Sequence, residues 1–141
     1  GLLTNLIAYT QLEPGTNMPT LSASTTLRVL GNTGLNQLLG GDSMCGTYSP
    51  GNPCPVSATS TIPQSEQRYA TSAVAYGSGT PLQPTSTPGT LLNQIPKPTS
   101  TSTPATGQTF WGIAVPSSIS LAGSYTGQNT FTGAVSSPLA W

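Results

Sequence analysis

Residues 19–30 show the clearest alternation of apolar and polar side chains in the chain. One face would carry Leu21, Ala23, Thr25, Leu27 and Val29, and the other would carry Thr20, Ser22, Ser24, Thr26 and Arg28. A period of two is typical of a half-buried strand. Glycine and asparagine in residues 31–34 predict a turn after it. The apolar run over residues 35–39 then predicts a brief strand or one helical turn.

Residues 108–135 contain a strand, a turn and a second strand. Thr109, Trp111, Ile113 and Val115 alternate with Phe110, Gly112 and Ala114. Apolar groups on both faces indicate a strand buried between two layers, which Pro116 should end. In the second half, one face would carry Tyr125, Asn129, Phe131 and Val135, and the other would carry Thr126, Gln128, Thr130 and Thr132. This pattern predicts a half-buried strand.

Two shorter segments also alternate. In residues 56–62 the repeating positions are Val56, Ala58, Ser60 and Ile62, and in residues 68–76 they are Ala70, Ser72, Val74 and Tyr76. Both segments are predicted to be strands.

Residues 81–108 have a different composition, rich in Pro, Thr and Ser. The phrase PTSTP at 84–88 is echoed by PTSTSTP at 98–104. Proline at this density favours extended, polyproline-like backbone, and Thr/Ser-Pro tracts are common sites of O-linked sugar. We therefore expect a long surface excursion held down by Leu91, Leu92 and Ile95, with Thr and Ser of residues 84–104 as candidate glycan sites.

Residues 1–12 fit two patterns. A helix would place Leu2, Leu3, Leu6, Ile7 and Thr10 on one face, whereas a strand would place Leu3, Ile7 and Tyr9 opposite Leu2, Leu6, Ala8 and Leu12. We favour the strand, and residues 13–15 (Glu-Pro-Gly) should end either element. An apolar strand at a chain end can pair into the sheet of another copy or into its own domain, and both remain open. The candidate assembly strand comprises Leu2, Leu3, Leu6, Ile7, Tyr9 and Leu12.

Composition supports an all-β fold with a surface that is almost uncharged. At 141 residues the chain fits one domain, expected over residues 13–141. It has 41 Ser and Thr residues, three basic residues, three acidic residues and no histidine. So little net charge favours self-association and leaves too few cations to bind nucleic acid or anionic membranes. No apolar span long enough for membrane insertion and no leader segment is visible, so we expect a mature form that begins at Gly1.

The sequence offers no catalytic set. The carboxylates Glu13, Asp42 and Glu66 lie in turn-like contexts, and no serine has a histidine to activate it. We expect no catalytic residue, no metal site and no cofactor, since Asp42 among Gly40, Gly41 and Ser43 is a weak signal for calcium. Trp111 has apolar neighbours and fits the core better than a sugar-stacking surface. Trp141 ends the chain and is a candidate anchor for a neighbouring subunit.

Cys45 and Cys54 bracket a short loop rich in Gly and Pro. Two cysteines without histidine cannot form a zinc site, and their spacing is not that of a CxxC redox motif. We therefore expect a structural disulfide, which would stabilise the fold by roughly 2.5 to 3 kcal/mol in the chain-entropy model. A disulfide implies an oxidising compartment and hence export; the alternative is a pair of buried thiols in a cytosolic protein.

The stretch WGIAVPSSISLAGSYTGQNTFTGAV at 111–135 resembles the closing hairpin of immunoglobulin-like β-sandwich modules in bacterial surface, S-layer and pilus proteins. In those modules a phrase like VPxxxxAGxYTGxxTFT leads into the last strand. The resemblance implies an antiparallel β-sandwich displayed outside the cell and transfers no functional residue. In pilins of the chaperone-usher type, a terminal strand of one subunit completes the sheet of the next, a role that residues 1–12 suit.

Three functions follow as hypotheses. The first is a structural subunit of an extracellular filament or surface layer, which would bind copies of itself by strand complementation. The second is a secreted adhesive or carbohydrate-binding module that uses aromatic side chains. The third is a virion coat or decoration protein, because such proteins share the low charge and β-rich composition.

Overall fold

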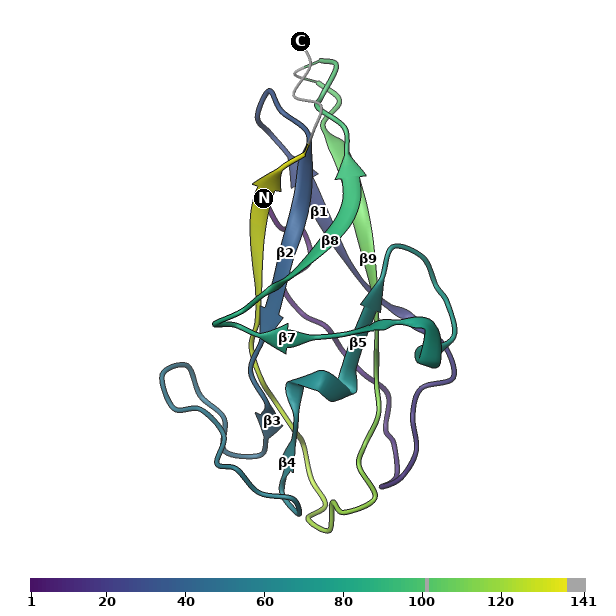
Figure 1. The fold of residues 1–141 in the computed structure, drawn as a ribbon, viewed down its shortest axis with the longest axis vertical. Helices are drawn as coiled ribbons and strands as arrows, with labels where there is room; N and C mark the ends of the chain where they lie inside the picture. The colour runs from purple at the N-terminus through teal and green to yellow at the C-terminus, as the bar shows by residue number, and fades with distance from the viewer. Residues whose placement is uncertain (101, 137–141) are drawn as a thin grey trace.

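The computed structural model describes residues 1–100 and 102–136, with the side chains of residues 92–94 outside that description. Its strands are β1 (Ala23–Val29), β2 (Leu35–Gly41), β3 (Met44–Cys45), β4 (Thr61–Ile62), β5 (Gln67–Ala70), β6 (Thr80–Pro81), β7 (Gln83–Pro84), β8 (Gly89–Ile95), β9 (Ala105–Ile113) and β10 (Asn129–Val135). Two short 3₁₀ turns, η1 (Gln64–Glu66) and η2 (Tyr76–Ser78), complete the described elements. The fold is a β-sandwich (Figure 1).

The first sheet has the order β1-β9-β5-β6, and every pairing in it is antiparallel. The long strand β9 lies at its centre, with β1 on one side and β5 on the other. The second sheet has β2 at its centre, with β10 on one side and β8 on the other. Strand β7 joins β2 in parallel, so this sheet is mixed where a purely antiparallel one was expected. Figure 1 shows β2, β8 and β10 in front of β1, β9 and β5.

The core between the sheets is built around Trp111, which has no exposed surface. Its ring lies 5.6 Å from that of Tyr69 and 5.7 Å from that of Phe131, the latter edge-on. Leu39, Leu82 and Leu91 fill the rest of this cluster. Such aromatic contacts add to the stabilisation from burial, so the expectation that Trp111 is a core residue is confirmed.

The core also contains polar contacts. Thr25 Oγ1 accepts a hydrogen bond from Trp111 Nε1 at 2.9 Å within the first sheet. Gln37 Nε2, from β2, donates to Thr109 Oγ1, from β9, at 3.0 Å and so links the two sheets. Gln37 is 1% exposed, and its Oε1 has no partner among the described residues. Because a buried amide loses stability when its N–H group has no acceptor, this contact favours the arrangement in which β2 lies over β9.

Strand β9 is covered on both sides at its carboxyl end, as the sequence pattern indicated. A Cβ atom on Gly112 would come within 2.6 Å of Leu21 Cδ2, so Leu21 packs directly on the outer face of β9. The Leu21 amide donates to the Val74 carbonyl at 2.9 Å, which holds the covering segment in place.

Several predicted elements are confirmed and others are wrong. The strand predicted over residues 19–30 is found as β1, with Thr25, Leu27 and Val29 buried, and residues 35–39 form a strand, β2. In residues 56–62 only the last two form a strand, and β5 ends at Ala70, well short of Tyr76. Residues 58–60 form a turn, residues 71–72 form a bend and η2 begins at Tyr76, so the backbone of both segments leaves the extended conformation that the alternation indicated.

The Pro-rich segment over residues 81–108 is also more regular than predicted. It contains β8, a seven-residue strand that pairs with β2, with a register shift between Leu35 and Gln37. Leu91 and Ile95 are buried as expected. Pairing with β2 stabilises residues 89–95 as a strand. This pairing outweighs the local preference of the Pro-rich sequence for a surface loop.

We predict that Thr109→Val alone lowers the free energy of unfolding by about 1 to 3 kcal/mol, because the buried Gln37 amide loses its partner. Adding Gln37→Leu should recover much of that loss, because both polar groups are then replaced by apolar groups of similar shape. Urea unfolding of the two single variants and the double variant, with the disulfide intact, tests this. Strictly additive losses would contradict a bond between the two side chains.

Candidate assembly groove

Residues 1–3 lie along the outer edge of β1. Leu2 faces Leu27 in an antiparallel bridge, the Leu3 amide donates to the Thr26 carbonyl at 2.8 Å, and the Arg28 amide donates to the Gly1 carbonyl at 2.8 Å. The first sheet therefore continues past β1 for this short distance.

Beyond Leu3 the predicted strand over residues 2–12 is wrong, and so is the helix. Residues 4–12 have neither strand nor helix assignment. The segment leaves the edge of β1, and Ile7, Tyr9 and Leu12 pack against the core clusters. Burying these side chains between the sheets takes the backbone out of the plane of either sheet, which explains why the ladder stops.

The six residues of the candidate assembly strand consequently divide into two groups. Ile7, Tyr9 and Leu12 are partly buried against the core. Leu2, Leu3 and Leu6 are 39%, 53% and 71% exposed. The segment thus has three side chains that pack on its own domain and three leucines that its own domain leaves partly in water, with Leu2 and Leu3 on opposite faces of the first sheet.

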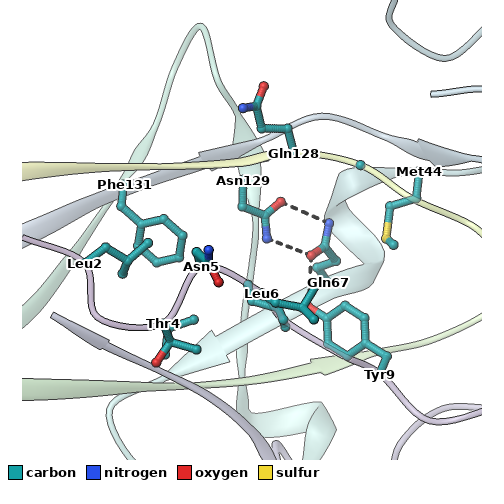
Figure 2. A pocket seen from close by; sticks show the side chains of 13 residues that line it. Leu2, Thr4, Asn5, Leu6, Tyr9, Met44, Gln67, Gln128, Asn129 and Phe131 are labelled. Carbon is teal, nitrogen blue, oxygen red and sulfur yellow. Dashed lines mark hydrogen bonds between the residues drawn. The ribbon is translucent and has the colours of Figure 1, made fainter. Parts of the chain in front are cut away.

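A groove of about 240 Å³ lies between this segment and β10 (Figure 2). The segment contributes Leu2, Thr4, Asn5, Leu6, Ile7 and Tyr9, and the sandwich contributes Thr25, Met44, Gln67, Gly127, Gln128, Asn129 and Phe131. In the part of the chain that the structure describes, β2 is the strand that pairs with β10, and no strand pairs with the opposite edge of β10. The groove therefore runs beside an edge strand, where backbone groups can pair with another chain.

Three polar side chains meet inside the groove. Tyr9 Oη donates to Gln67 Oε1 at 2.9 Å, and Asn129 Nδ2 donates to the same oxygen at 2.8 Å. Gln67 Nε2 in turn donates to Asn129 Oδ1 at 3.4 Å. Figure 2 shows the two amides side by side, with dashed lines marking their bonds. The triad ties residues 1–12 to β5 and β10 at one point, so it sets the register of the segment in the groove.

Burial, with a smaller contribution from Tyr76, raises the pKa of the Tyr9 phenol far above its ordinary value. Tyr9 therefore stays protonated, and remains a hydrogen-bond donor to Gln67, in alkaline solution where an exposed tyrosine would ionise.

The two predicted cysteines and Asp42 lie outside the groove. The disulfide between Cys45 and Cys54 is confirmed. Both oxygens of Asp42 accept hydroxyl hydrogen bonds, from Tyr48 at 3.0 Å and from Thr85 at 3.3 Å. Among the described residues there is no cluster of three acidic, cysteine or histidine side chains that could hold a metal ion. Trp141 falls outside the described residues.

Gln67 and Asn129 were not singled out from the sequence as site residues. They are separated by 62 positions and come from different sheets. Nothing local marks two such amides as partners. The available signal for Gln67 was its position directly before the alternating segment over residues 68–76, two residues from the aromatic Tyr69.

Comparisons with known proteins gave no relative: no family model, no curated protein and no solved structure matches this chain. The resemblance to immunoglobulin-like modules therefore stays a prediction. Within the described residues, the structure has no helix with the length and apolarity needed to cross a membrane.

We predict that Tyr9→Phe lowers the free energy of unfolding by about 0.5 to 1.5 kcal/mol near pH 7, because one hydrogen bond to Gln67 is lost. Above pH 10 the unfolded chain releases the Tyr9 proton while the folded chain keeps it, so folding loses stability as pH rises. The wild type should therefore lose stability more steeply than the variant, by up to about 1.4 kcal/mol per pH unit.

Urea unfolding between pH 7 and pH 11 measures both effects. Tyr125→Phe, in a loop outside the groove, is the control for removal of a tyrosine hydroxyl. Parallel curves for the wild type and Tyr9→Phe above pH 10 would show that the Tyr9 phenol ionises as freely in the folded chain as in the unfolded one.

Proposed function

We propose that this protein is a structural subunit of an extracellular assembly, a pilus-like filament or a surface layer, made of copies of itself. One observation carries the proposal: Leu2 and Leu6 expose apolar surface beside β10, which among the described residues has a strand partner on one edge alone. Exposed apolar side chains beside an unpaired strand edge are typical of interaction sites in soluble proteins.

The charge distribution supports self-association. The chain has six charged side chains, and its formal net charge is zero at pH 7. Arg68 is taken up by its own domain, since it donates to the Gly77 carbonyl and lies 4.9 Å from the Tyr76 ring centre. Asp42 is likewise held by two hydroxyls. Copies can approach one another without the electrostatic repulsion that keeps charged proteins apart.

An extracellular location is supported by the disulfide, since such bonds persist in oxidising compartments. The hydroxyls of Thr85, Ser86, Thr87, Ser102 and Thr103 belong to exposed residues. Sugar attached to them would lie on the surface, where it would keep an almost uncharged particle hydrated. Trp111 is fully buried and cannot stack on a sugar ligand, which leaves the carbohydrate-binding hypothesis without its main aromatic residue.

We predict that the wild-type protein associates as its concentration rises and that Leu6→Lys weakens this association about 10- to 100-fold. This range corresponds to a loss of about 1.5 to 3 kcal/mol per contact, the free energy gained when a leucine side chain such as that of Leu6 is buried against a neighbouring copy. Leu6 is 71% exposed, so the substitution should leave folding intact. Light scattering after size-exclusion chromatography measures the association, and negative-stain microscopy shows its form.

Val56→Lys is the matched control, because Val56 is fully exposed but does not line the groove. This variant should assemble like the wild type. A wild-type protein that stays monomeric at millimolar concentration, or equal weakening by both lysine variants, would contradict the proposed function.

A further inference from the structure

We propose that two copies of this chain pair through the outer edge of β10, antiparallel and about a two-fold axis, so that their second sheets form one continuous sheet. This inference rests on the proposed function, and it names the surface and the partner of one contact in the assembly. It is carried by a difference among the outer strands: the chain protects the others and, among the described residues, leaves the edge of β10 bare.

The other outer strands of the two sheets carry features that prevent pairing with a further chain. Residues 1–3 cover the edge of β1 with backbone hydrogen bonds. Strands β6 and β7 have two residues each, and the second residue of each is a proline. Strand β8 lies between Pro88 and Pro96 and has a register shift against β2. Short strands, prolines, irregular pairing and covering segments are the means by which β-proteins keep their sheet edges from joining.

Strand β10 has none of these features. It is seven residues long, its register against β2 is unbroken, and it contains no proline and no charged side chain. Within residues 1–100 and 102–136 no strand pairs with its outer edge, which lies at the margin of the front sheet (Figure 1). An unprotected edge of this length can accept another strand.

The outward-facing backbone groups of β10 follow from its bonds to β2. At one end the Asp42 amide donates to the Gln128 carbonyl at 2.9 Å, and at the other the Ser136 amide donates to the Gly34 carbonyl at 3.0 Å. Since bonding alternates along an antiparallel strand, the even-numbered residues between these ends bond β2. The N–H and C=O groups of the odd-numbered residues therefore face the outer edge; these residues are Asn129, Phe131, Gly133 and Val135.

The order of these four residues allows the edge to pair with itself. An antiparallel pairing centred on Thr132 places Phe131 opposite Gly133 of the copy and Asn129 opposite Val135 of the copy. All four outward residues then exchange both of their backbone hydrogen bonds. A pairing centred on Phe131 or on Gly133 would leave a residue at one end of the strand unpaired.

The side chains fit the same register. Gly133 leaves room beside the ring of Phe131 of the copy, and Thr132 meets Thr132 on the outer face in a favourable cross-strand pair. Val135 is 59% exposed in the single copy and would pack beside Asn129, a residue of the groove. Inner-face residues meet only inner-face residues, so the joined sheet keeps its inner and outer faces.

A second copy is the occupant that the charges favour. Lys97 is the last charged residue in the sequence, so residues 98–141 carry no charged side chain. Such an edge has nothing that would attract a charged segment of another protein, whereas two copies meet without repulsion. An edge that pairs with itself about a two-fold axis also makes the type of interface that is most common among assemblies of identical chains.

The experiment places one cysteine on β10 at a time. Thr132 and Thr130 are both exposed and lie on the same face of the strand. In the proposed pairing the two copies of residue 132 stand directly opposite each other, at a Cα separation of about 4.5 Å that a disulfide can span. The two copies of residue 130 are four residues out of register, roughly 14 Å apart. Each variant is assembled with the native disulfide intact, then oxidised and run on a non-reducing gel.

We expect covalent dimers from Thr132→Cys and almost none from Thr130→Cys. Dimers from neither variant, or in equal yield from both, would overturn the pairing, and in assembled material either result leaves the proposed function standing. Dimers of Thr132→Cys without larger particles support the pairing and contradict the filament or layer. Protein that stays monomeric contradicts both.

A second measurement removes one outward N–H group without altering the bonds between β10 and β2. Gly133→Pro deletes the amide hydrogen that would bond Phe131 of the copy, whereas Gly133→Ala keeps it. Gly133 is exposed, and a Cβ atom there would meet Leu35 at an ordinary 3.5 Å, so both variants should fold. Light scattering should show that Gly133→Pro associates about 10- to 100-fold more weakly than Gly133→Ala, because a symmetric pair loses two bonds. Equal association of the two variants, with urea unfolding showing that both are folded, would mean that the edge has another occupant.

Discussion

The open side of the sandwich is the constraint on which the rest of the structure depends. Strands β1 and β10 are the outermost strands of their sheets, and the groove between them reaches Thr25 and Phe131, both in contact with Trp111. Without residues 1–12, water would reach the largest side chain of the core. The chain closes this side with a segment that makes few backbone hydrogen bonds. Three leucines of this segment stay exposed, and the edge strand β10 lies beside the segment.

Polar contacts give this uncharged core its specificity. Apolar side chains alone would allow the two sheets to slide over each other, because burial has no direction. The bond between Gln37 and Thr109 fixes β2 over β9, and the triad of Tyr9, Gln67 and Asn129 fixes the segment over the groove. The register of the fold and the fit of its closing segment therefore depend on a few amides and hydroxyls.

The sequence predicted the all-β class, the disulfide, the buried role of Trp111 and the strands β1 and β9, because each depends on local alternation or on two nearby cysteines. It missed β8, because flanking prolines hide a strand whose partner β2 is distant in the chain. It gave residues 1–12 the wrong conformation for the same reason, since Gln67 and Asn129 determine where Tyr9 goes. The sequence identified the residues of this segment. The groove that they line became visible only in the tertiary structure, because its other residues come from distant parts of the chain.

The central claim is that residues 1–12 close an otherwise stable sandwich through few backbone hydrogen bonds. Native-state hydrogen exchange on dilute protein tests it most directly, by comparing the Leu3 amide with the amides that join β1 to β9. The account predicts that the Leu3 amide exchanges through local opening, at a free energy well below that of global unfolding, and gains protection when the protein assembles. A Leu3 amide as protected in the dilute monomer as the β1–β9 ladder would contradict it.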